Sequence, residues 1–277
     1  MQTALFKRVG IVGIGLIGGS LAKDLRSLGL TERLLGWNRT RAHAERAIEL
    51  GLIDEVCPTV EALVEGSDLI VLATPVDVLV KLLPHVLDCL RPGQVVIDVG
   101  STKQALVEVV KDHPNRKQFV ACHPMAGTEK SGPDAAVDAL FRNRFTLLIN
   151  PEESDAELLC RVSSMWSQVG ALLATMSAQE HDQTAALLSH MPHVLAYALL
   201  RTIKEAERNQ ALNARFAGGG LASMTRIAHS PISMWRPIFK QNKKALLEAI
   251  DCFMAHLSVF REVIANDEDE RLTELMQ

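Results

Sequence analysis

The stretch VGIVGIGLIG, residues 9–18, runs a short apolar segment directly into a glycine triplet of the form GxGxxG. Residues 9–13 are predicted to form a strand. The residues after the triplet are predicted to form a helix, because Leu21, Leu25 and Leu28 recur on one helical face. A strand, a glycine-rich turn and a helix in this order are the context in which such a triplet predicts a dinucleotide-binding turn.

Each glycine of the triplet has a separate predicted role. Gly13 allows the tight turn, Gly15 lets the main chain approach a pyrophosphate, and Gly18 permits close packing of the helix. The main-chain amides of Leu16 and Ile17, at the start of the helix, face the anion in this arrangement. A glycine-rich turn without a ligand is the alternative, and the ordered strand, turn, helix and second strand favour the binding interpretation.

The end of the second predicted strand bears on which dinucleotide binds. A site for NAD usually offers Asp or Glu to the ribose 2′-hydroxyl about twenty residues past the last glycine, whereas a 2′-phosphate favours arginine without a carboxylate. Here Asn38 stands at the acidic position and is followed by Arg39 and Thr40. The pattern favours NADP, with NAD as the alternative; a solvated helix start that contacts no cofactor is the plainer interpretation of Arg39 and Arg41.

Short apolar runs alternate with helical patterns over the first part of the chain. The runs cover residues 9–13, 34–37, 69–73, 95–99, 119–122 and 145–149. Because they are apolar throughout and separated by helices, they predict buried parallel strands in an α/β fold, a Rossmann-type doubly wound sheet. Residues 158–169 are predicted as a further helix and residues 171–176 as a closing strand. Thr74 and Pro75, just past the third run, are also assigned to the cofactor site.

The strand pattern ends at residue 176. Residues 1–176 are therefore predicted to be a dinucleotide-binding domain, and residues 177–277 an all-helical second domain for substrate binding and dimerisation. One seam of the last helix is apolar and comprises Leu246, Ile250, Phe253, Leu257, Phe260 and Ile264. The seam packs either in the domain's own core or in a helical subunit interface, because a domain of this size has limited core of its own. A homodimer through the helical domain is the expected assembly.

Composition excludes several classes of protein. The 277 residues are 48% hydrophobic, yet no apolar run reaches the roughly 18 residues that a membrane helix needs. The N-terminus lacks the regions of a signal peptide, so a cytoplasmic location is expected. A formal net charge of −4 offers no basic footprint for nucleic acid. Five widely spaced cysteines without a CxxC pair predict reduced, mostly buried thiols rather than disulfides or a zinc site.

Two further motifs follow predicted central strands. DVGSTK, residues 98–103, lies at the carboxyl end of one strand, and HPMAGTEKSG, residues 123–132, lies just past the next. Ligands of an open α/β sheet bind beyond these strand ends, so Ser101 and His123 are expected to face the nicotinamide. A lone histidine is more often structural, but Pro124 and the glycines that bracket this loop indicate an irregular segment rather than a core element.

The chain resembles the prephenate and arogenate dehydrogenases of tyrosine biosynthesis, the TyrA family. The resemblance spans nearly the whole chain and rests on several motifs in order: GIGLIGGSLA at 13–22, DVGSTK at 98–103, HPMAGTEKSG at 123–132, His181-Asp182, SHMPH at 189–193, GGGLASMTRIAHSPISMW at 218–235, and Asn242-Lys243. It implies the oxidative decarboxylation of an anionic cyclohexadienyl substrate with hydride transfer to NADP or NAD, and it implies no metal.

The resemblance also implies catalytic roles. His123 matches the residue that accepts the proton of the substrate hydroxyl as a carbonyl develops, and Ser101 holds it and the hydroxyl in register. A histidine with a pKa near 6.5 suits this role at neutral pH.

Further matches imply contacts with the substrate. Arg226 matches the arginine that binds the substrate carboxylate, next to Thr225, and without the resemblance a surface salt bridge is the plainer interpretation of this arginine. His193 matches a second binding position that His190 orients, with Pro192 expected to interrupt the helix and bend His193 toward the cleft. Two other residues match positions at the pocket mouth, namely Glu129 and Trp235.

One segment departs from the family pattern. The family commonly has Phe-Arg-Asp before the Thr-Arg pair, where this chain has Leu221, Ala222 and Ser223. The aspartate that would hold Arg226 is therefore missing, which bears on the aim of that arginine and on the preference between prephenate and arogenate.

Two other functions compete with this one. A β-hydroxyacid dehydrogenase pairs a similar nucleotide domain with a helical domain and uses a catalytic lysine, for which Lys243 and Lys244 are candidates. They lie outside that family's usual motif. A nucleotide-sensing regulatory protein without turnover would account for the glycine triplet and the helical seam, but it leaves His123, Ser101 and Arg226 without a task.

Overall fold

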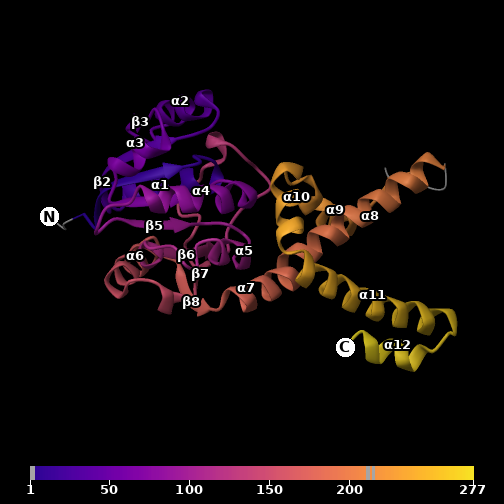
Figure 1. Ribbon diagram of the computed structural model, residues 1–277. Helices are drawn as coiled ribbons and strands as arrows, with labels where there is room; N and C mark the ends of the chain where they lie inside the picture. The colour runs from indigo at the N-terminus through magenta and orange to yellow at the C-terminus, as the bar shows by residue number, and fades with distance from the viewer. Residues whose placement is uncertain (1–3, 210–212, 214–215) are drawn as a thin grey trace. The chain divides into compact units, whose positions relative to one another are not determined.

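A computed structural model describes residues 4–209, 213 and 216–277 of the chain (Figure 1). They form two compact units: residues 1–182 together with 229–241 make up the first, and residues 183–228 together with 242–277 make up the second. The domain boundary after residue 176 stays a prediction. By packing, residues 177–182 and 229–241 belong with the N-terminal unit.

The first unit is built around one sheet with the strand order β3-β2-β1-β4-β5-β6-β7-β8. The strands are β1 (Phe6–Val12), β2 (Thr31–Trp37), β3 (Glu55–Val56), β4 (Leu69–Leu72), β5 (Val95–Asp98), β6 (Phe119–Pro124), β7 (Phe145–Ile149) and β8 (Leu172–Met176). The order reverses between β1 and β4, which is the point where a doubly wound fold binds its ligand beyond the strand ends. The predicted Rossmann-type fold with a helical second part is confirmed.

The prediction that every strand is parallel is wrong at β7. This strand pairs with β6 in the antiparallel direction, with His123 opposite Leu147. Parallel neighbours need a crossover connection, usually a helix. The connection from β6 to β7 contains only the short 3-10 helix η2 (Pro133–Ala135), so the chain returns beside β6 in the opposite direction. The helix α6 (Ala156–Gln168) then restores parallel pairing between β7 and β8.

Helices cover both faces of the sheet. The helices that contribute residues to one hydrophobic cluster are α1 (Leu16–Ser27), α2 (Arg41–Glu49) and α6. Those that contribute to the other cluster are α3 (Val60–Glu65), α4 (Val76–Asp88), α5 (Gln104–Glu108) and α10 (Ile232–Gln241). Alternate residues of a strand point to opposite faces. In β4, Leu69 and Val71 join the first cluster, while Ile70 and Leu72 join the second. Burial on both faces explains why the predicted strands are apolar throughout.

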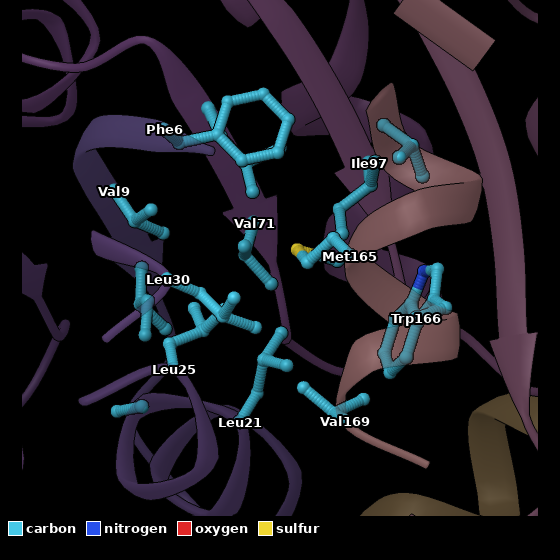
Figure 2. Packing of buried hydrophobic residues seen from close by; sticks show 14 of the residues in the cluster. Phe6, Val9, Leu21, Leu25, Leu30, Val71, Ile97, Met165, Trp166 and Val169 are labelled. Atoms are coloured by element: carbon cyan, nitrogen blue, oxygen red, sulfur yellow. The ribbon is translucent and has the colours of Figure 1, made fainter. Parts of the chain in front are cut away.

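Figure 2 shows the first cluster, which joins Met165 and Trp166 of α6 with Ile97 of β5 and with Leu21 and Leu25 of α1. These side chains are almost completely buried. The third leucine predicted on this face of α1 is the exception. Leu28 lies just past the end of the helix and is 50% exposed, so the apolar face of α1 is one turn shorter than predicted.

The described part of the second unit is helical. It contains the π-helical turn η4 (Ala186–His190), α8 (Met191–Arg208), α9 (Gly219–Thr225), α11 (Lys243–Ala265) and α12 (Asp269–Leu275), with the 3-10 turn η6 (Arg226–His229) leading back to the first unit. The regular α-helix is interrupted just before Pro192, by a π turn rather than by a break in the helix, and the bend of His193 toward the cleft stays a prediction. Helix α7 (Ala178–Ala185) continues through η4 into α8, because a wider π turn just before proline accommodates the missing N–H and the bulk of the ring.

The apolar seam of α11 is only partly covered within the chain. Leu246 is buried at 5% exposure, whereas Leu257 and Ile264 are 54% and 59% exposed. The three other members of the seam are half-buried.

Within the described residues, no helix is both long and apolar enough to cross a membrane.

The cysteine prediction is confirmed only in part. All five thiols are free, but only Cys57 and Cys122 are buried, while Cys160 and Cys252 are exposed. The thiols of the two exposed cysteines lie on helices α6 and α11, whose outer faces meet solvent.

Asp155 caps the helix that closes the first core cluster. Its carboxylate accepts hydrogen bonds from the main-chain N–H groups of Glu157 and Leu158, at 2.9 and 3.1 Å. Asp155→Ala is expected to lower the free energy of unfolding by about 1 kcal/mol, because these amides lose their partner. Urea denaturation checks this, with cofactor binding as the control that should not change. An unaltered midpoint would mean that solvent replaces the cap.

Candidate active site

The glycine-rich turn between β1 and α1 has the geometry that a dinucleotide requires. Gly13 has a φ of 96°, and a Cβ atom there would lie 2.5 Å from the carbonyl oxygen of Ala73. A Cβ atom on Gly18 would lie 2.4 Å from the carbonyl oxygen of Gly13. A Cβ atom on Gly15, by contrast, would meet nothing within 4 Å. Two glycines are therefore needed for the turn and its packing, and the third leaves open space at the helix N-terminus.

The side chains around this turn also fit a nicotinamide dinucleotide. The Ile14 N–H donates to Oδ1 of Asn38 at 2.8 Å, which leaves the amide NH₂ of Asn38 to donate. Arg39 and Thr40 are exposed beside it. In the described part of the chain, the hydroxyl oxygen of Thr74 is buried without a hydrogen-bond partner, and a polar ligand group at the turn would satisfy it.

His123 lies on a strand rather than after one. Strand β6 runs two residues further than the apolar pattern indicated, and His123 is its second-last residue. The main chain of His123 pairs with Leu147 of the antiparallel β7, and His123 as a whole is 8% exposed. The Met125 N–H donates to the carbonyl oxygen of Phe145 at 2.7 Å, so the chain stays pinned to β7 just past the histidine. This histidine is thus fixed at the carboxyl end of a central strand, where ligands of this fold bind.

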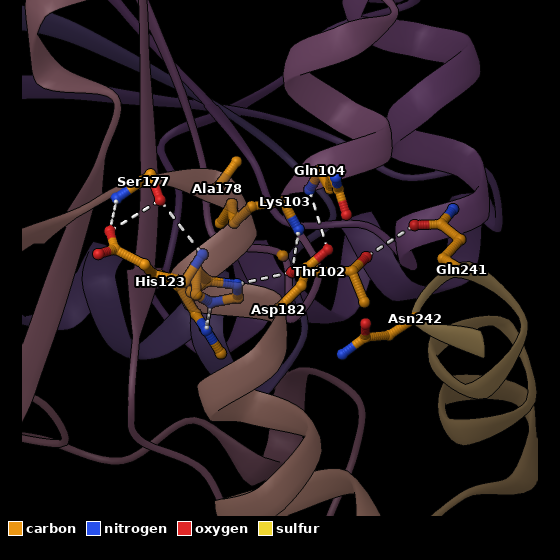
Figure 3. Close-up of polar contacts among 12 residues, drawn as sticks. Thr102, Lys103, Gln104, His123, Ser177, Ala178, Asp182, Gln241 and Asn242 are labelled. Atoms are coloured by element: carbon orange, nitrogen blue, oxygen red, sulfur yellow. Dashed lines mark hydrogen bonds and ion pairs between the residues drawn. The ribbon is translucent and has the colours of Figure 1, made fainter. Parts of the chain in front are cut away.

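His123 ends a chain of buried side chains (Figure 3). Its Nδ1 is hydrogen-bonded to Nε2 of His181 at 2.7 Å, and Nδ1 of His181 is hydrogen-bonded to Oδ1 of Asp182 at 2.7 Å. His181 and Asp182 are 1% and 3% exposed and come from α7. Burial lowers the pKa of His181, and the hydrogen bond to Asp182 opposes this shift without cancelling it.

A second buried carboxylate shapes the loop after β5. Asp98 pairs with the ammonium group of Lys103, and neither side chain is exposed to solvent. Asp98 also accepts the N–H groups of Gly100 and Cys122, at 2.8 and 3.2 Å. The loop between Asp98 and Lys103 carries the half-buried Ser101 and is therefore tied to β5 and β6 together.

The loop after β5 is also tied to α10. The Thr102 hydroxyl donates to Oε1 of Gln241 at 2.7 Å, as Figure 3 shows. The loop that carries Ser101 is thus held by the ion pair between Asp98 and Lys103 and by the hydrogen bond from Thr102 to Gln241.

The remaining substrate-site predictions of the first unit fall on α10 and on the loop after β6. Trp235 is 6% exposed and packs in the second hydrophobic cluster, with its ring 5.5 Å from that of Phe239. Glu129 is half-buried in the loop. A role for these two residues at the pocket mouth stays a prediction.

The other predicted substrate residues belong to the second unit. His190 is 1% exposed, and its Nδ1 is hydrogen-bonded to the side-chain amide of Asn242 at 3.0 Å. Nδ1 of His193 donates to the carbonyl oxygen of Ser189 at 3.0 Å, so its Nε2 carries the lone pair when the ring is neutral. Burial lowers the pKa of His193, and the positive charge of Arg226 lowers it further.

Arg226 and Thr225 lie where α9 passes into η6. The Arg226 side chain is exposed, whereas Thr225 is buried and its hydroxyl donates to the carbonyl oxygen of Leu221 at 2.8 Å. The charge of Arg226 acts on His193, which places these two predicted substrate residues in one electrostatic neighbourhood.

Comparison with known proteins identifies the family. Residues 21–175 match the model described as "Prephenate dehydrogenase, nucleotide-binding domain", and residues 177–277 match "Prephenate dehydrogenase, dimerization domain". The chain belongs to the prephenate dehydrogenase family. The resemblance inferred from the motifs is thereby confirmed.

Relatives in this family span nearly the whole chain. A cyclohexadienyl dehydrogenase of Zymomonas mobilis is 30% identical over 271 residues, which are 98% of this chain and 92% of that protein. A prephenate dehydrogenase of Bacillus subtilis is 33% identical over 95% of this chain and 71% of its own length.

Solved structures of prephenate and arogenate dehydrogenases have the same fold. The prephenate dehydrogenase of A. aeolicus, in complex with hydroxyphenyl propionate and NAD+, superposes with a TM-score of 0.88 at 32% identity, covering 98% of this chain and 94% of that one. The arogenate dehydrogenase of Synechocystis superposes with a TM-score of 0.78 at 29% identity, covering 98% and 96% of the two chains.

Proposed function

We propose that this member of the prephenate dehydrogenase family oxidatively decarboxylates prephenate, arogenate or both, and that it passes the hydride to NADP in preference to NAD. The observation that carries the proposal is the placement of His123 at the carboxyl end of β6, with Nδ1 of its ring bonded inward to His181. The family match and the glycine-rich turn support the same reaction.

His123 is the proton acceptor in this proposal. The bound cofactor supplies the hydride acceptor. As the hydride leaves the ring carbon that carries the hydroxyl, a carbonyl develops there, and His123 removes the hydroxyl proton. Ser101, on the loop held by Asp98 and Lys103, keeps the hydroxyl and the imidazole in register. Carbon dioxide then departs as its bonding electrons enter the ring, which becomes aromatic, so that no metal is needed.

Residues of the second unit are proposed to bind the substrate's negative charge. Arg226 makes the charge-assisted contact with a carboxylate, with Thr225 beside it in the sequence. His193 offers a further polar contact, because the hydrogen bond from its Nδ1 to Ser189 fixes the orientation of its ring. Ser223 is exposed where the family pattern has an aspartate, so Arg226 is not oriented by a carboxylate at that position.

The assembly proposed for this chain is a homodimer through the helical domain. The second family model is described as a dimerization domain. The exposed part of the α11 seam includes Leu257 and Ile264. It provides apolar surface of the kind that subunit interfaces bury.

An assay of the purified protein tests the proposed reaction. The protein is incubated with prephenate or arogenate and with NADP or NAD, and the absorbance of the reduced cofactor is followed. Turnover of either substrate supports the proposal. Turnover of a β-hydroxyacid with neither cyclohexadienyl substrate would identify the competing dehydrogenase, and cofactor binding without any turnover would identify a sensing protein.

The preference for NADP rests on Asn38 and Arg39. Because Oδ1 of Asn38 is occupied by the Ile14 N–H, this side chain presents donor hydrogens to the ribose, which suits a phosphate better than a hydroxyl in need of an acceptor. Arg39 is exposed next to it and can pair with a 2′-phosphate or stack on adenine.

Arg39→Ala is expected to weaken NADP binding by about five- to tenfold, the worth of one exposed charge-assisted contact, while NAD binding barely changes. Fluorescence titration of the two reduced cofactors measures this. Arg41→Ala is the matched control, because Arg41 pairs with Glu45 at 2.9 Å on the outside of α2. A tenfold preference of the wild type for NAD in catalytic efficiency would contradict the proposal, and Asn38→Asp would then strengthen that preference.

A further inference from the structure

We propose that His181 and Asp182 are positioning residues that hold His123 in one tautomer, with the proton on Nδ1 and the lone pair on Nε2 facing the substrate. The proposal rests on the proposed function, because it explains how the proton acceptor of that reaction is prepared. It follows from three hydrogen-bonding steps that start at Asp182.

The first step fixes Asp182 as an acceptor. The Lys103 N–H donates to Oδ1 at 2.8 Å, and the Gln104 N–H donates to Oδ2 at 3.0 Å. A main-chain N–H can only donate, so both carboxylate oxygens must accept. These bonds come from the start of α5, and Asp182 is 3% exposed.

The second step fixes the proton of His181. Its Nδ1 lies 2.7 Å from Oδ1 of Asp182, so Nδ1 carries the hydrogen that the carboxylate accepts. In a neutral imidazole the other nitrogen is then an acceptor. The ring is 1% exposed, and this burial favours its neutral form.

The third step fixes His123. Its Nδ1 lies 2.7 Å from Nε2 of His181, which can only accept in the arrangement just described. Nδ1 of His123 therefore carries the hydrogen, and Nε2 carries the lone pair. A positioned partner that selects the tautomer of a catalytic imidazole is a known requirement of general base catalysis by histidine.

Other buried charges near the chain leave this assignment intact. Lys103 contributes only its main-chain N–H to Asp182, because its ammonium group pairs with Asp98. The positive charge of Lys103 and the negative charges of Asp98 and Asp182 have opposing effects on the pKa of His181, and burial outweighs them in lowering it.

The first test observes the tautomer without substrate. Two-bond ¹H–¹⁵N correlation spectra of the ¹⁵N-labelled wild type distinguish Nδ1–H from Nε2–H imidazoles, and His123→Asn identifies the signals of His123 by their loss. At alkaline pH, where imidazoles are neutral, the expected pattern is Nδ1–H for both His123 and His181. An Nε2–H pattern for His123 in the wild type would overturn the proposal, whatever reaction the protein catalyses.

Asp182→Asn tests the origin of the tautomer. The asparagine amide has one acceptor oxygen where the carboxylate had two. Its NH₂ group must therefore either face a main-chain N–H, donor against donor, or donate a hydrogen bond to Nδ1 of His181. Donation to His181 reverses both hydrogen bonds of the chain and protonates Nε2 of His123. We expect a loss of the single Nδ1–H pattern and a fall in kcat of about tenfold or more, with little change in cofactor affinity.

His181 offers a test that separates positioning from packing. His181→Gln keeps a side chain that can accept from His123, whereas His181→Phe keeps the ring shape without hydrogen bonds. Positioning predicts that the Gln variant retains a higher kcat than the Phe variant, with similar KM for the cofactor. A purely structural role predicts the reverse order, which would contradict the proposal.

Asp24→Asn is the matched control for loss of a buried carboxylate. Asp24 lies on α1 and is 5% exposed. Its Oδ1 accepts a hydrogen bond from the Ala139 N–H at 2.8 Å rather than from a histidine. It is expected to leave kcat and the His123 spectrum unchanged. If the wild type shows the expected tautomers but turns over neither prephenate nor arogenate, the proposed function fails while the assignment of the hydrogen-bond chain stands.

Discussion

His123→Asn is expected to lower kcat by roughly 10²- to 10⁴-fold, the usual contribution of a positioned general base, without loss of cofactor affinity. An asparagine amide at this position can still donate to Nε2 of His181, so the buried partner is not left unsatisfied. It cannot accept the hydroxyl proton at neutral pH. Steady-state kinetics with saturating substrate and cofactor measure the fall in kcat, and cofactor titration measures the affinity.

His113→Asn is the control for this substitution. His113 is half-buried before the start of β6, and its ring is 3.1 Å from a carboxylate oxygen of Asp88. Its replacement leaves the carboxyl ends of the strands untouched, so kcat should stay near the wild-type value. A His123→Asn enzyme that keeps more than half of the wild-type turnover would remove His123 from the mechanism.

Arg226→Ala is expected to raise the KM for the substrate about ten- to a hundredfold, which corresponds to the 1.5–3 kcal/mol of a charge-assisted hydrogen bond. The KM for the cofactor should change far less, because the proposed partner of Arg226 is the substrate carboxylate. The side chain is exposed, so its removal opens no cavity in a hydrophobic core. Initial rates over a range of substrate and cofactor concentrations measure both constants.

Arg33→Ala is the matched control for Arg226. Arg33 makes an exposed salt bridge to Glu55 at 2.6 Å, near the amino end of β2 and away from the ligand-binding ends of the strands. Neither KM should respond to its loss. An Arg226→Ala enzyme with unchanged affinity for substrate would show that Arg226 has only a structural role. The serine at position 223, where the family pattern has an aspartate that holds this arginine, would then explain that result.

Strand positions could be predicted from the sequence, whereas strand direction could not. The run at 145–149 coincides with β7, but a strand buried on both faces has the same apolar pattern whether it runs parallel or antiparallel. Its direction depends on the connection from β6, which lacks a crossover helix. Strand β3 had no pattern to find, because it consists only of Glu55 and Val56, and the first of these is exposed.

The candidate site shows a similar division. The glycine roles followed from local geometry and agree with the space around Gly13, Gly15 and Gly18. His181 and Asp182 were visible as neighbours in one motif, and a histidine followed by an acid is the signal that could have suggested a hydrogen-bond chain. Their bond to His123 depends on the packing of α7 against β6, which no local pattern specifies.

Two aromatic and helical details depended on tertiary structure in the same way. The burial of Trp235 in a hydrophobic cluster follows from the packing of α10 on α4, although the residue lies far along the chain from that helix. At Pro192 the sequence indicated a break, but the π turn before it provides room for the ring, and the helix continues.

Asp98 and Asp182 have a consequence for the energetics of turnover. These two buried carboxylates accept hydrogen bonds from main-chain N–H groups of the loop after β5, of β6 and of the start of α5. The geometry around the proposed proton acceptor is therefore settled while the chain folds, and the entropy lost in ordering it is not lost again in each catalytic cycle. In the proposed mechanism, fixed dipoles of this kind need little reorganisation as charge moves onto the imidazole, so that rigidity at this edge of the sheet lowers the barrier to the reaction.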